Sequence, residues 1–392
     1  MGLGLAHVEA AADDETEDRM SRLAVLRLML TDFRSYARVE IHAGEGPVVL
    51  TGKNGAGKTN ILEALSFLTP GRGLRGGRLG DAARIGGGGG WAVAATLKGP
   101  DGPVSLGTGI TGADDAGVER RIVRVDGETQ GSTAALGQHM RMVWLTPQMD
   151  GLFLDSASAR RRFFDRLTAA FHTGHGSQLN AYERAMRERN RLLQEGRADA
   201  YWLDALEAQM AAHGTALAAA RLDTVRQLKA ALDLAEGAFP RAELALQGTL
   251  EEALNTQPAV EVEDAFKARL KLLRSADAQA GRAGVGPHRS DLEAVHMAKD
   301  MPAALCSTGE QKALLLGITL GSARMIAAQT GAAPVILLDE VAAHLDDERR
   351  AALFDEICAL GAQVWLSGAD RALFAGLEGR AMFFSVAQGK VS

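Results

Sequence analysis

Strand patterns dominate the first 150 residues of the chain. Apolar and polar positions alternate, as in half-buried strands, in Trp91 to Leu97, Val104 to Ile110 and Glu119 to Val125. Strand composition is also found in Leu23 to Leu30, Val39 to Ile41, Val48 to Leu50 and Met142 to Leu145, the last two being short apolar runs typical of buried strands. These patterns predict a unit built mainly from sheets over residues 23–150.

The pattern changes after Asp150. From Ala159 to about Ala280 the chain is rich in Ala, Leu, Arg, Glu and Gln at helical spacing, with few β-branched residues. This composition predicts a helical lobe over residues 151–282, inserted between two halves of the sheet-containing unit.

Sheet patterning returns near the C-terminus, in Val335 to Leu338 and Gln363 to Leu366. Residues 283–392 are therefore expected to complete the unit begun by the N-terminal half. The apolar stretch Ala313 to Ala328 is interrupted by Arg324 and is too short to span a bilayer, which favours a buried helix.

Length and charge narrow the possibilities further. At 392 residues the chain exceeds the size at which one hydrophobic core stops growing, so a second lobe is expected. The net charge of −6 gives no general affinity for nucleic acids, so any such contact must come from local basic patches. Residues 1–22 are acidic and are expected to be a disordered extension without a signal sequence. Cys306 and Cys358 form no disulfide framework, which fits the cytoplasm.

A glycine-rich turn lies between the strand Val48 to Leu50 and the helix Asn60 to Leu68. Its sequence, Gly52-Lys53-Asn54-Gly55-Ala56-Gly57-Lys58-Thr59, matches a P-loop in the context that this motif requires. Backbone N–H groups of such a turn surround phosphates, while Lys58 would reach the β- and γ-phosphates and Thr59 would bind Mg²⁺. A chance glycine-rich turn is the alternative interpretation.

Two carboxylates end the buried strand Val335 to Leu338. Asp339 suits the coordination sphere of Mg²⁺, and Glu340 can polarise an attacking water. Solvated acids at a strand end are common, but together with the P-loop this pair completes an ATPase site.

Cys306-Ser307-Thr308-Gly309-Glu310-Gln311-Lys312 precedes the apolar helix. Ser307 or Thr308 can cap that helix, so a capping box is the simpler interpretation. The order along the chain also fits the ABC signature, whose helix N-terminus contacts the γ-phosphate held by a second subunit. Gln148 occupies the place of a Q-loop glutamine that touches Mg²⁺, and 342–346 resembles a D-loop.

Together these motifs give a specific resemblance. Leu30-Thr31-Asp32-Phe33-Arg34-Ser35-Tyr36, the P-loop, Gly286-Pro287-His288-Arg289 and the signature stand in the order found in the RecF family of SMC/Rad50-like ABC ATPases, which the chain resembles from Leu23 to its C-terminus. The resemblance implies an α/β fold, namely an ABC-type P-loop head with a RecA-like core, an antiparallel β subdomain and an inserted helical lobe. It also implies ATP-dependent homodimers, binding to gapped or single-strand/duplex junction DNA, and cooperation with RecR and RecO in loading RecA.

The motifs and the resemblance together define the expected site. ATP is expected to contact Gly52, Lys53, Asn54, Gly55, Ala56, Gly57, Lys58, Thr59, Asn60, Arg34, Ser307, Thr308, Gly309, Glu310 and Gln311. Catalysis is assigned to Glu340, Lys58 and Ser307, and Mg²⁺ binding to Thr59, Gln148 and Asp339. The strand Gln363 to Leu366 is followed by Ser367-Gly368-Ala369-Asp370, with no histidine where ABC transporters have their switch residue, so slow hydrolysis is expected.

Other functions fit parts of the pattern. A transporter ATPase subunit, an OLD- or Rad50-like protein with nuclease activity, and a scaffold with a structural ATP site are the alternatives. The large helical lobe and the lack of a switch histidine argue against a transporter. Apart from the ATP site, the sequence has no evident cluster of metal-binding residues that would support a nuclease.

Two basic clusters are candidate contacts for DNA phosphates. Arg72, Arg75, Arg78 and Arg84 lie in a Gly/Arg segment that ends in five glycines and is expected to be mobile, and Arg160, Arg161, Arg162 and Arg166 open the helical lobe. Solvated faces with local ion pairs are the alternative interpretation.

Overall fold

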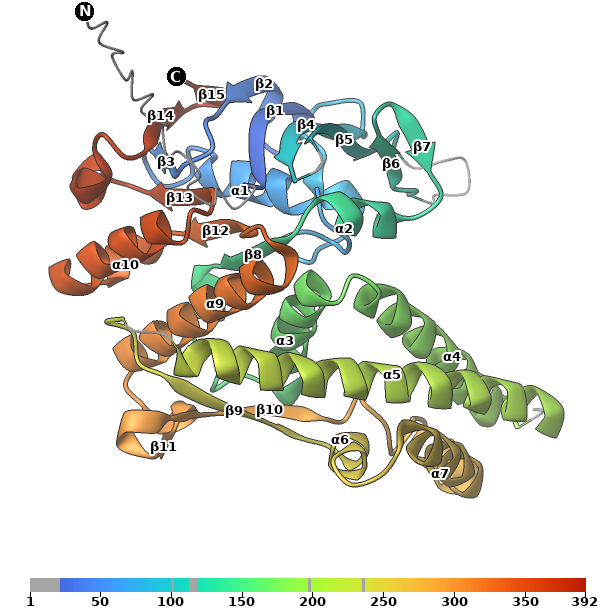
Figure 1. Cartoon of the computed structure of the whole chain (residues 1–392). Coiled ribbons are helices and arrows are strands. Elements are labelled where there is room, and N and C mark those ends of the chain that lie inside the picture. Colours follow the sequence, from blue (N-terminus) through green and yellow to red (C-terminus); the bar gives the residue numbers. More distant parts are fainter. Residues whose placement is uncertain (1–21, 101, 113–118, 197–198, 235–236) are drawn as a thin grey trace, which may run out of the picture.

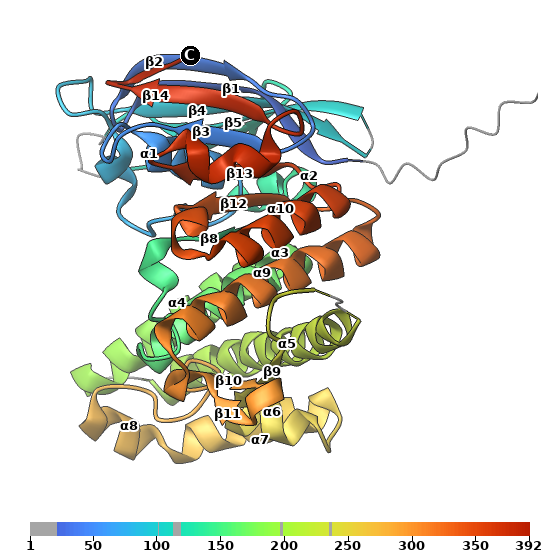
Figure 2. The same ribbon diagram turned by 90° about the vertical axis from the view of Figure 1, so that its left-hand side faces the viewer.

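Two six-stranded sheets and a largely helical lobe, with a third sheet of three strands, make up the part of the chain that the computed structural model describes, residues 22–100, 102–112, 119–196, 199–234 and 237–392. Figures 1 and 2 show the two sheets in the upper part of the molecule and the helical lobe below them. Apart from Arg22, the predicted acidic extension 1–22 lies outside the described residues.

The central sheet has the order β15-β14-β3-β13-β12-β8 and is parallel except for the short strand β15. Its strands are β3 (Val48–Thr51), β8 (Met142–Leu145), β12 (Val335–Asp339), β13 (Val364–Gly368), β14 (Met382–Ala387) and β15 (Lys390–Val391). Strands from both ends of the chain thus form one sheet, which confirms the predicted α/β fold. The sequence patterns had not predicted β14 and β15.

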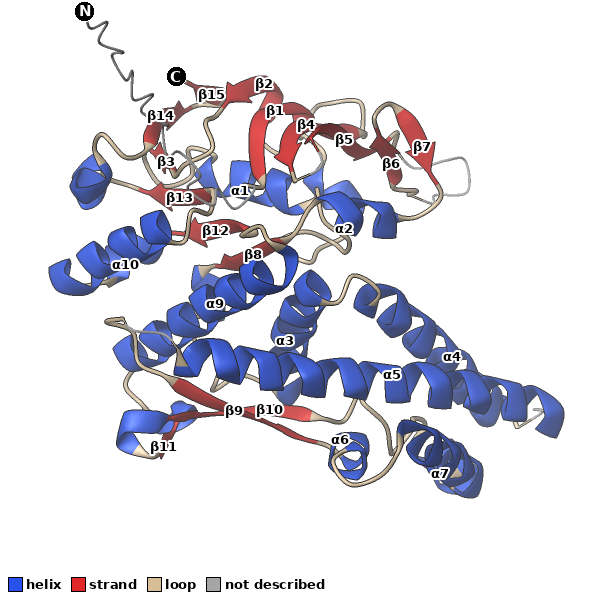
Figure 3. Cartoon of the chain, viewed as in Figure 1, coloured by secondary structure: helices blue, strands red, loops and turns tan. Residues whose placement is uncertain are grey.

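The second sheet is antiparallel, with the order β2-β1-β4-β5-β6-β7. It consists of β1 (Ala24–Phe33), β2 (Tyr36–His42), β4 (Trp91–Gly99), β5 (Gly102–Ile110), β6 (Ile122–Val125) and β7 (Glu128–Gln130). The helix α1 (Lys58–Ser66) shares one hydrophobic cluster with strands of both sheets (Figure 3). The antiparallel sheet and the start of α1 are therefore held in a fixed relation to the central sheet.

Alternating side chains of β12 connect the two faces of the central sheet. Val335 and Leu337 point into the cluster around α1, whereas Ile336 and Leu338 belong to a second cluster on the other face. That second face is covered by α3 (Ala157–Phe171), α9 (Thr308–Thr330) and α10 (Asp347–Ala359).

The helix α9 contains the predicted buried helix. It is the one helix in the described part of the chain that is long and apolar enough to cross a membrane, and 78% of its apolar window is buried inside the protein. Such burial is typical of a core helix in a globular protein.

Helices α3 to α8 form the predicted lobe. Besides α3 they are α4 (His175–Glu195), α5 (Ala200–Asp233), α6 (Thr249–Leu254), α7 (Ala259–Leu272) and α8 (Arg274–Ala280). The prediction of helix throughout was wrong for β9 (Ala242–Gln247), which pairs with β10 (Asp291–His296), itself paired with β11 (Met301–Pro302). The first four residues of β9 alternate between buried and exposed, but Ala, Glu, Leu and Gln are also helix formers, so the composition hid the strand.

The Gly/Arg segment is anchored more firmly than its composition predicts. Leu79–Ala82 forms a 3₁₀ helix, Ala83 bridges to Phe33, and the Trp91 ring N–H donates to the Leu79 carbonyl at 2.8 Å. Arg84 forms an ion pair with Asp32 at 2.7 Å. The expectation of a mobile loop was therefore wrong for this part, because contacts with β1 and β4 outweigh the freedom that glycine gives.

Buried ion pairs hold the helical lobe together. The guanidinium of Arg189 on α4 is fully buried and donates to Glu207 on α5 at 2.9 Å, to Asp277 on α8 at 2.7 Å and to the Leu270 carbonyl on α7 at 2.7 Å. One side chain thus connects four helices.

We predict that Arg189→Ala destabilises the protein by about 3–5 kcal/mol, because it leaves the buried Asp277 without its arginine and takes one of two arginine partners, the other being Arg274, from the buried Glu207. Arg187→Ala is the matched control on the same helix, since Arg187 is exposed and pairs only with Glu183 at 3.2 Å. It should cost less than about 1 kcal/mol. Urea denaturation followed by circular dichroism measures both, and equal effects of the two substitutions would contradict the assigned role.

Candidate nucleotide site

The P-loop lies between β3 and α1, and two of its positions require glycine because a side chain would clash there. Gly52 and Gly57 have φ values of 152° and 115°. A Cβ atom at Gly52 would lie 2.2 Å from the Val386 carbonyl oxygen, and one at Gly57 would lie 2.6 Å from the Tyr36 hydroxyl. The Tyr36 hydroxyl also donates to the Gly57 carbonyl at 3.1 Å. Only glycine fits both positions, and the loop is thereby held against β14 and β2.

Lys58 folds back across the loop. Its Nζ atom donates to the carbonyl oxygens of Gly52 at 2.7 Å and Lys53 at 3.1 Å. Burial lowers the pKa of Lys58, and the nearby carboxylates of Glu340 and Asp339 act in the opposite direction. The ammonium group is therefore positioned beside the turn whose N–H groups would surround phosphates.

The carboxylate of Asp339 meets the first turn of α1. The Thr59 hydroxyl lies 3.0 Å from each carboxylate oxygen of Asp339, and the Ser367 hydroxyl donates to the same group at 2.6 Å. A hydroxyl and a carboxylate converging in this way are the oxygen ligands that Mg²⁺ prefers, so these residues fit the ion that a P-loop site requires. Ser367, at the end of the neighbouring strand β13, orients this carboxylate.

Glu340 follows at a bend in the backbone. Its φ of 55° is left-handed, which is uncommon for a residue with a side chain. The Glu340 N–H donates to the Ser367 hydroxyl at 3.0 Å, so the same serine fixes both acidic residues. The bend turns Glu340 away from the line of β12, at the edge of the sheet where the P-loop begins.

Gln148 lies in the 3₁₀ helix Pro147–Met149, directly after β8, which is the neighbour of β12. Its side chain is exposed, and in the described residues no hydrogen bond joins it to Thr59 or Asp339. The topology therefore brings Gln148 to the expected edge of the sheet without a direct contact to the other two predicted Mg²⁺ ligands.

A buried carboxylate that the sequence had not indicated organises the neighbourhood of α1. Arg34 donates to Glu63 at 2.6 and 2.8 Å, and Arg75 pairs with the same carboxylate. Asn60 donates to the Ser35 hydroxyl at 3.0 Å and accepts from Arg75 at 3.1 Å. Arg34 and Asn60 thus lie near the P-loop helix, as expected, but their side chains are engaged with protein groups.

The signature is the N-terminus of α9. The Ser307 side chain accepts from the Glu310 N–H at 3.4 Å, and the Ser307 N–H donates to the Glu310 carboxylate at 3.0 Å, which confirms the capping box. Lys299 pairs with Glu310 and, with the bonds from Ser307, lowers the pKa of Glu310 to about 2. A capped helix and a phosphate-binding helix terminus do not exclude each other.

The signature faces solvent, away from the P-loop of its own chain. Ser307, Thr308 and Gly309 are exposed, whereas Gln311 is buried and donates to the Cys306 carbonyl at 2.9 Å. Figures 1 and 2 place α1 in the upper part of the molecule and β11, just before α9, in the lower part. The structure therefore does not bring the two predicted halves of the nucleotide site together within one chain.

Three contacts connect the signature and the Gly286–Arg289 run to the rest of the protein. Lys312, in the first turns of α9, pairs with Asp150 at 2.8 Å, two residues beyond Gln148. His288 accepts or donates a bond with the Tyr182 hydroxyl at 2.7 Å, and Arg221 donates to the Pro287 carbonyl at 2.7 Å. The Gly286–Arg289 run therefore packs against α4 and α5 of the lobe.

The predicted basic clusters divide into paired and unpaired arginines. Arg160 forms a bidentate pair with Asp291, and Arg75 and Arg84 pair with acidic residues as described. Arg161 donates to the Ser290 carbonyl at 2.6 Å. Arg72, Arg78 and Arg162 are exposed and, among the described residues, form no ion pair.

The sequence did not predict the contacts of three residues that bind predicted site residues. These are Glu63, Ser367 and Lys299. Each acts through a residue far away in the chain or outside any motif, so no local pattern marks it. Glu63 had one weak signal, a carboxylate on the apolar-spaced helix that follows the P-loop.

Comparison with known proteins identifies the family of the chain. A family model described as "AAA domain" matches residues 27–137. "DNA replication and repair protein RecF" of Mesorhizobium japonicum is 51% identical over 369 residues, covering 94% of this chain and 97% of that protein. The protein of the same name from Brucella abortus is 48% identical and covers 97% of this chain and 99% of its own length.

A solved structure of the recombination mediator protein RecF with ATPrS, in the RecFOR pathway, has the same fold. It superimposes with a TM-score of 0.81 at 20% identity and covers 95% of this chain and 98% of that protein. The two relatives are about half identical to this chain in sequence, and the match covers almost the full length of both proteins. This similarity establishes the family. The chain belongs to the RecF family of DNA replication and repair proteins.

Proposed function

We propose that this protein is an ATP-dependent DNA-binding protein of recombinational repair and replication, in which ATP joins two copies of the chain. The observation that carries the proposal is the separation of the exposed signature at Ser307 from the P-loop of the same chain. A second copy related by two-fold symmetry supplies the missing half-site, and the first copy supplies it in return.

Each side chain then has a defined task. Lys58 and the N–H groups of the P-loop bind the phosphates, and the N-terminus of α9 from the second chain meets the γ-phosphate with Ser307. Thr59 and Asp339, with Gln148 completing the set, would hold Mg²⁺, which when bound neutralises charge on the phosphates. Glu340 orients and polarises the attacking water, so hydrolysis separates the two chains.

Hydrolysis acts as a timer in this scheme and is expected to be slow. Ser367 is hydrogen-bonded to Asp339 and cannot titrate near neutral pH, so it does not replace a switch histidine. Tight ATP binding is still possible, because the Ser307 hydroxyl is exposed and the Lys58 ammonium group is already held beside the P-loop.

The DNA contacts in this proposal come from Arg72, Arg75, Arg78, Arg84, Arg160, Arg161 and Arg162. The unpaired members, Arg72, Arg78 and Arg162, are the primary contacts, because phosphates need not displace a carboxylate to reach them. Gapped or single-strand/duplex junction DNA is the proposed ligand, RecR, RecO and RecA are the proposed partners, and the cytoplasm is the proposed location.

Fluorescence anisotropy of a labelled gapped duplex tests the proposal as a whole. Protein is titrated with ATP, with a non-hydrolysable ATP analogue and with ADP. Tight binding with the analogue and weak binding with ADP is the expected result. Affinity that does not depend on the nucleotide would separate the ATP site from DNA and contradict the proposal.

We predict that Glu340→Gln abolishes hydrolysis and retains ATP binding, because the amide keeps the shape of the side chain and cannot accept the proton of water. Phosphate release should fall by at least about 10²-fold, the usual contribution of a general base. Binding of a fluorescent ATP analogue should change less than about twofold. Unchanged phosphate release would favour the scaffold interpretation, with an ATP site that is only structural.

We predict that Ser307→Arg abolishes nucleotide-dependent DNA binding, because a bulky cation blocks the docking face of the signature. ATP binding by the single chain should persist, since the P-loop is elsewhere. Ser105→Arg, which changes an exposed serine on β5, is the control and should bind gapped duplex as the unmodified protein does. Tight, analogue-dependent binding by Ser307→Arg would rule out the composite site.

A further inference from the structure

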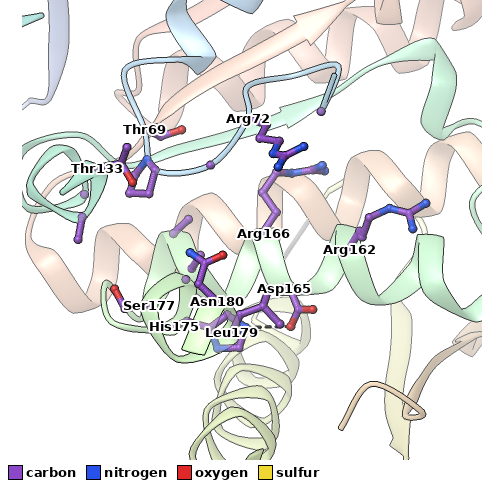
Figure 4. A pocket seen from close by; sticks show the side chains of 18 of the residues that line it. Thr69, Arg72, Thr133, Arg162, Asp165, Arg166, His175, Ser177, Leu179 and Asn180 are labelled. Carbon is purple, nitrogen blue, oxygen red and sulfur yellow. Dashed lines mark hydrogen bonds and ion pairs between the residues drawn. The ribbon is translucent and has the colours of Figure 1, made fainter. Parts of the chain in front are cut away.

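A cavity of about 660 Å³ is lined by arginines of both basic clusters, which are far apart in the chain. Its walls are the loop after α1 with Arg72 and Arg75, the segment 132–144, and the helices α3 and α4. Figure 4 shows Arg166 extending from α3 toward the loop that carries Arg72, with Arg162 further along the same helix. The loop and the lobe therefore enclose one space lined with cations.

The charge in this cavity is not balanced. The lining residues include seven arginines, Arg72, Arg75, Arg141, Arg161, Arg162, Arg166 and Arg221, but only two carboxylates, Asp165 and Glu183. Asp165 is already paired, since the nitrogen atoms of Arg221 and His175 each lie 2.8 Å from one of its carboxylate oxygens. Glu183 is paired with Arg187. Arg75 pairs with Glu63. Among the described residues, the remaining five arginines have no carboxylate within 4.0 Å.

Arg166 is the most unusual of the five. Its guanidinium lies over the Trp144 ring at 4.5 Å, and its Nε atom is enclosed without a hydrogen-bond partner. Burial lowers the pKa of Arg166 to about 9, so the group still carries its charge at neutral pH. A desolvated cation that faces a cavity without a counter-charge is costly, and an anion entering the cavity would offset that cost.

Phosphate matches these groups best. Guanidinium groups bind phosphate oxygens in a bidentate manner, and several converging arginines are typical of phosphate sites. The aromatic rings in the wall, Trp144 and Tyr182, are 5% and 1% exposed, so they offer no surface on which a base could stack. The site therefore recognises the backbone of a nucleic acid without preference for its bases.

We propose that this cavity is a phosphate-binding pocket that takes a nucleotide of an unpaired DNA strand, held by Arg166, Arg72 and Arg162. The volume of the cavity is in the range of sites for small molecules. A rigid duplex is too wide to bring its phosphates into a space of this size. A flexible single strand can do so. The pocket would give the protein a means of distinguishing a junction from continuous duplex, an inference that rests on the DNA binding proposed above.

The test compares a labelled single-stranded oligonucleotide with a blunt duplex, by anisotropy at several salt concentrations with the ATP analogue present. The double variant Arg72→Gln/Arg162→Gln removes two exposed cations that have no carboxylate partner. Affinity for the single strand should fall about tenfold, and the slope of log K against log salt should become shallower by about 1.4, or about 0.7 for each lost phosphate contact. Binding of the blunt duplex should fall by a much smaller factor than binding of the single strand, and binding of ATP should be unchanged.

Arg226→Gln is the matched control, because Arg226 is an exposed arginine of the same lobe that does not line the cavity. It should leave single-strand binding as it is. Arg166→Gln is the second variant and should weaken single-strand binding further, provided its circular dichroism spectrum is that of the unmodified protein. Oligonucleotides of thymine alone and of mixed sequence should bind equally.

An unchanged salt slope for the double variant would overturn the pocket and leave the ATP-gated binding of gapped duplex standing. Loss of duplex and single-strand affinity in equal measure would also overturn it, since the arginines would then belong to a general DNA surface. Displacement of the oligonucleotide by millimolar dTMP or inorganic phosphate, beyond that by chloride of equal ionic strength, would show a site for free phosphates. Failure of the unmodified protein to bind DNA with any nucleotide would refute the proposed function itself.

Discussion

The Asp339 carboxylate holds the nucleotide end of the molecule together. It accepts hydrogen bonds from Thr59 on α1 and from Ser367 on β13, and Ser367 in turn accepts the N–H of Glu340. Thr59 lies 280 residues before Asp339 in the chain, and Ser367 lies 28 residues after it. Because the central sheet brings the carboxyl ends of its parallel strands to one edge, a single buried acid can align the P-loop helix with the residue proposed to activate water.

In our proposal, the same architecture leaves each chain with an incomplete site. Burying α9 against the central sheet places its N-terminus outside, with Ser307 capped by its own Glu310 and exposed to solvent. The orphan N–H groups of that terminus are a ready binding site for an anion. In our proposal the anion is the γ-phosphate bound by another copy, and the helical lobe, whose helices α3 and α5 pack against α9, moves with it.

The sequence was most informative where function is local. The P-loop, the Asp339-Glu340 pair and the capping box at Ser307 are short motifs whose physical requirements lie within a few residues, and the structure has each in the predicted element. Burial of Val335 to Leu338 and of α9 followed from apolar runs. The strands of both sheets, except β7, β14 and β15, were visible as alternating or apolar segments.

Long-range partners could not be found in this way. The pairing of Arg34 and Arg75 with Glu63, and of Ser367 with Asp339, depends on the topology of the sheet, which no spacing encodes. The strand β9 was missed because helix formers occupy it and pairing with β10 decides its conformation. The cavity between Arg72 and Arg166 likewise exists only when the loop after α1 packs above α3.

Sedimentation velocity of the full chain tests the central claim, a nucleotide site completed by two copies. The measurement is made with the non-hydrolysable ATP analogue and Mg²⁺, and again with ADP and Mg²⁺, in the absence of DNA. The account predicts a species of twice the chain mass with the analogue and a single chain with ADP. A single chain in both conditions, at protein concentrations where the analogue is shown to be bound, would contradict it.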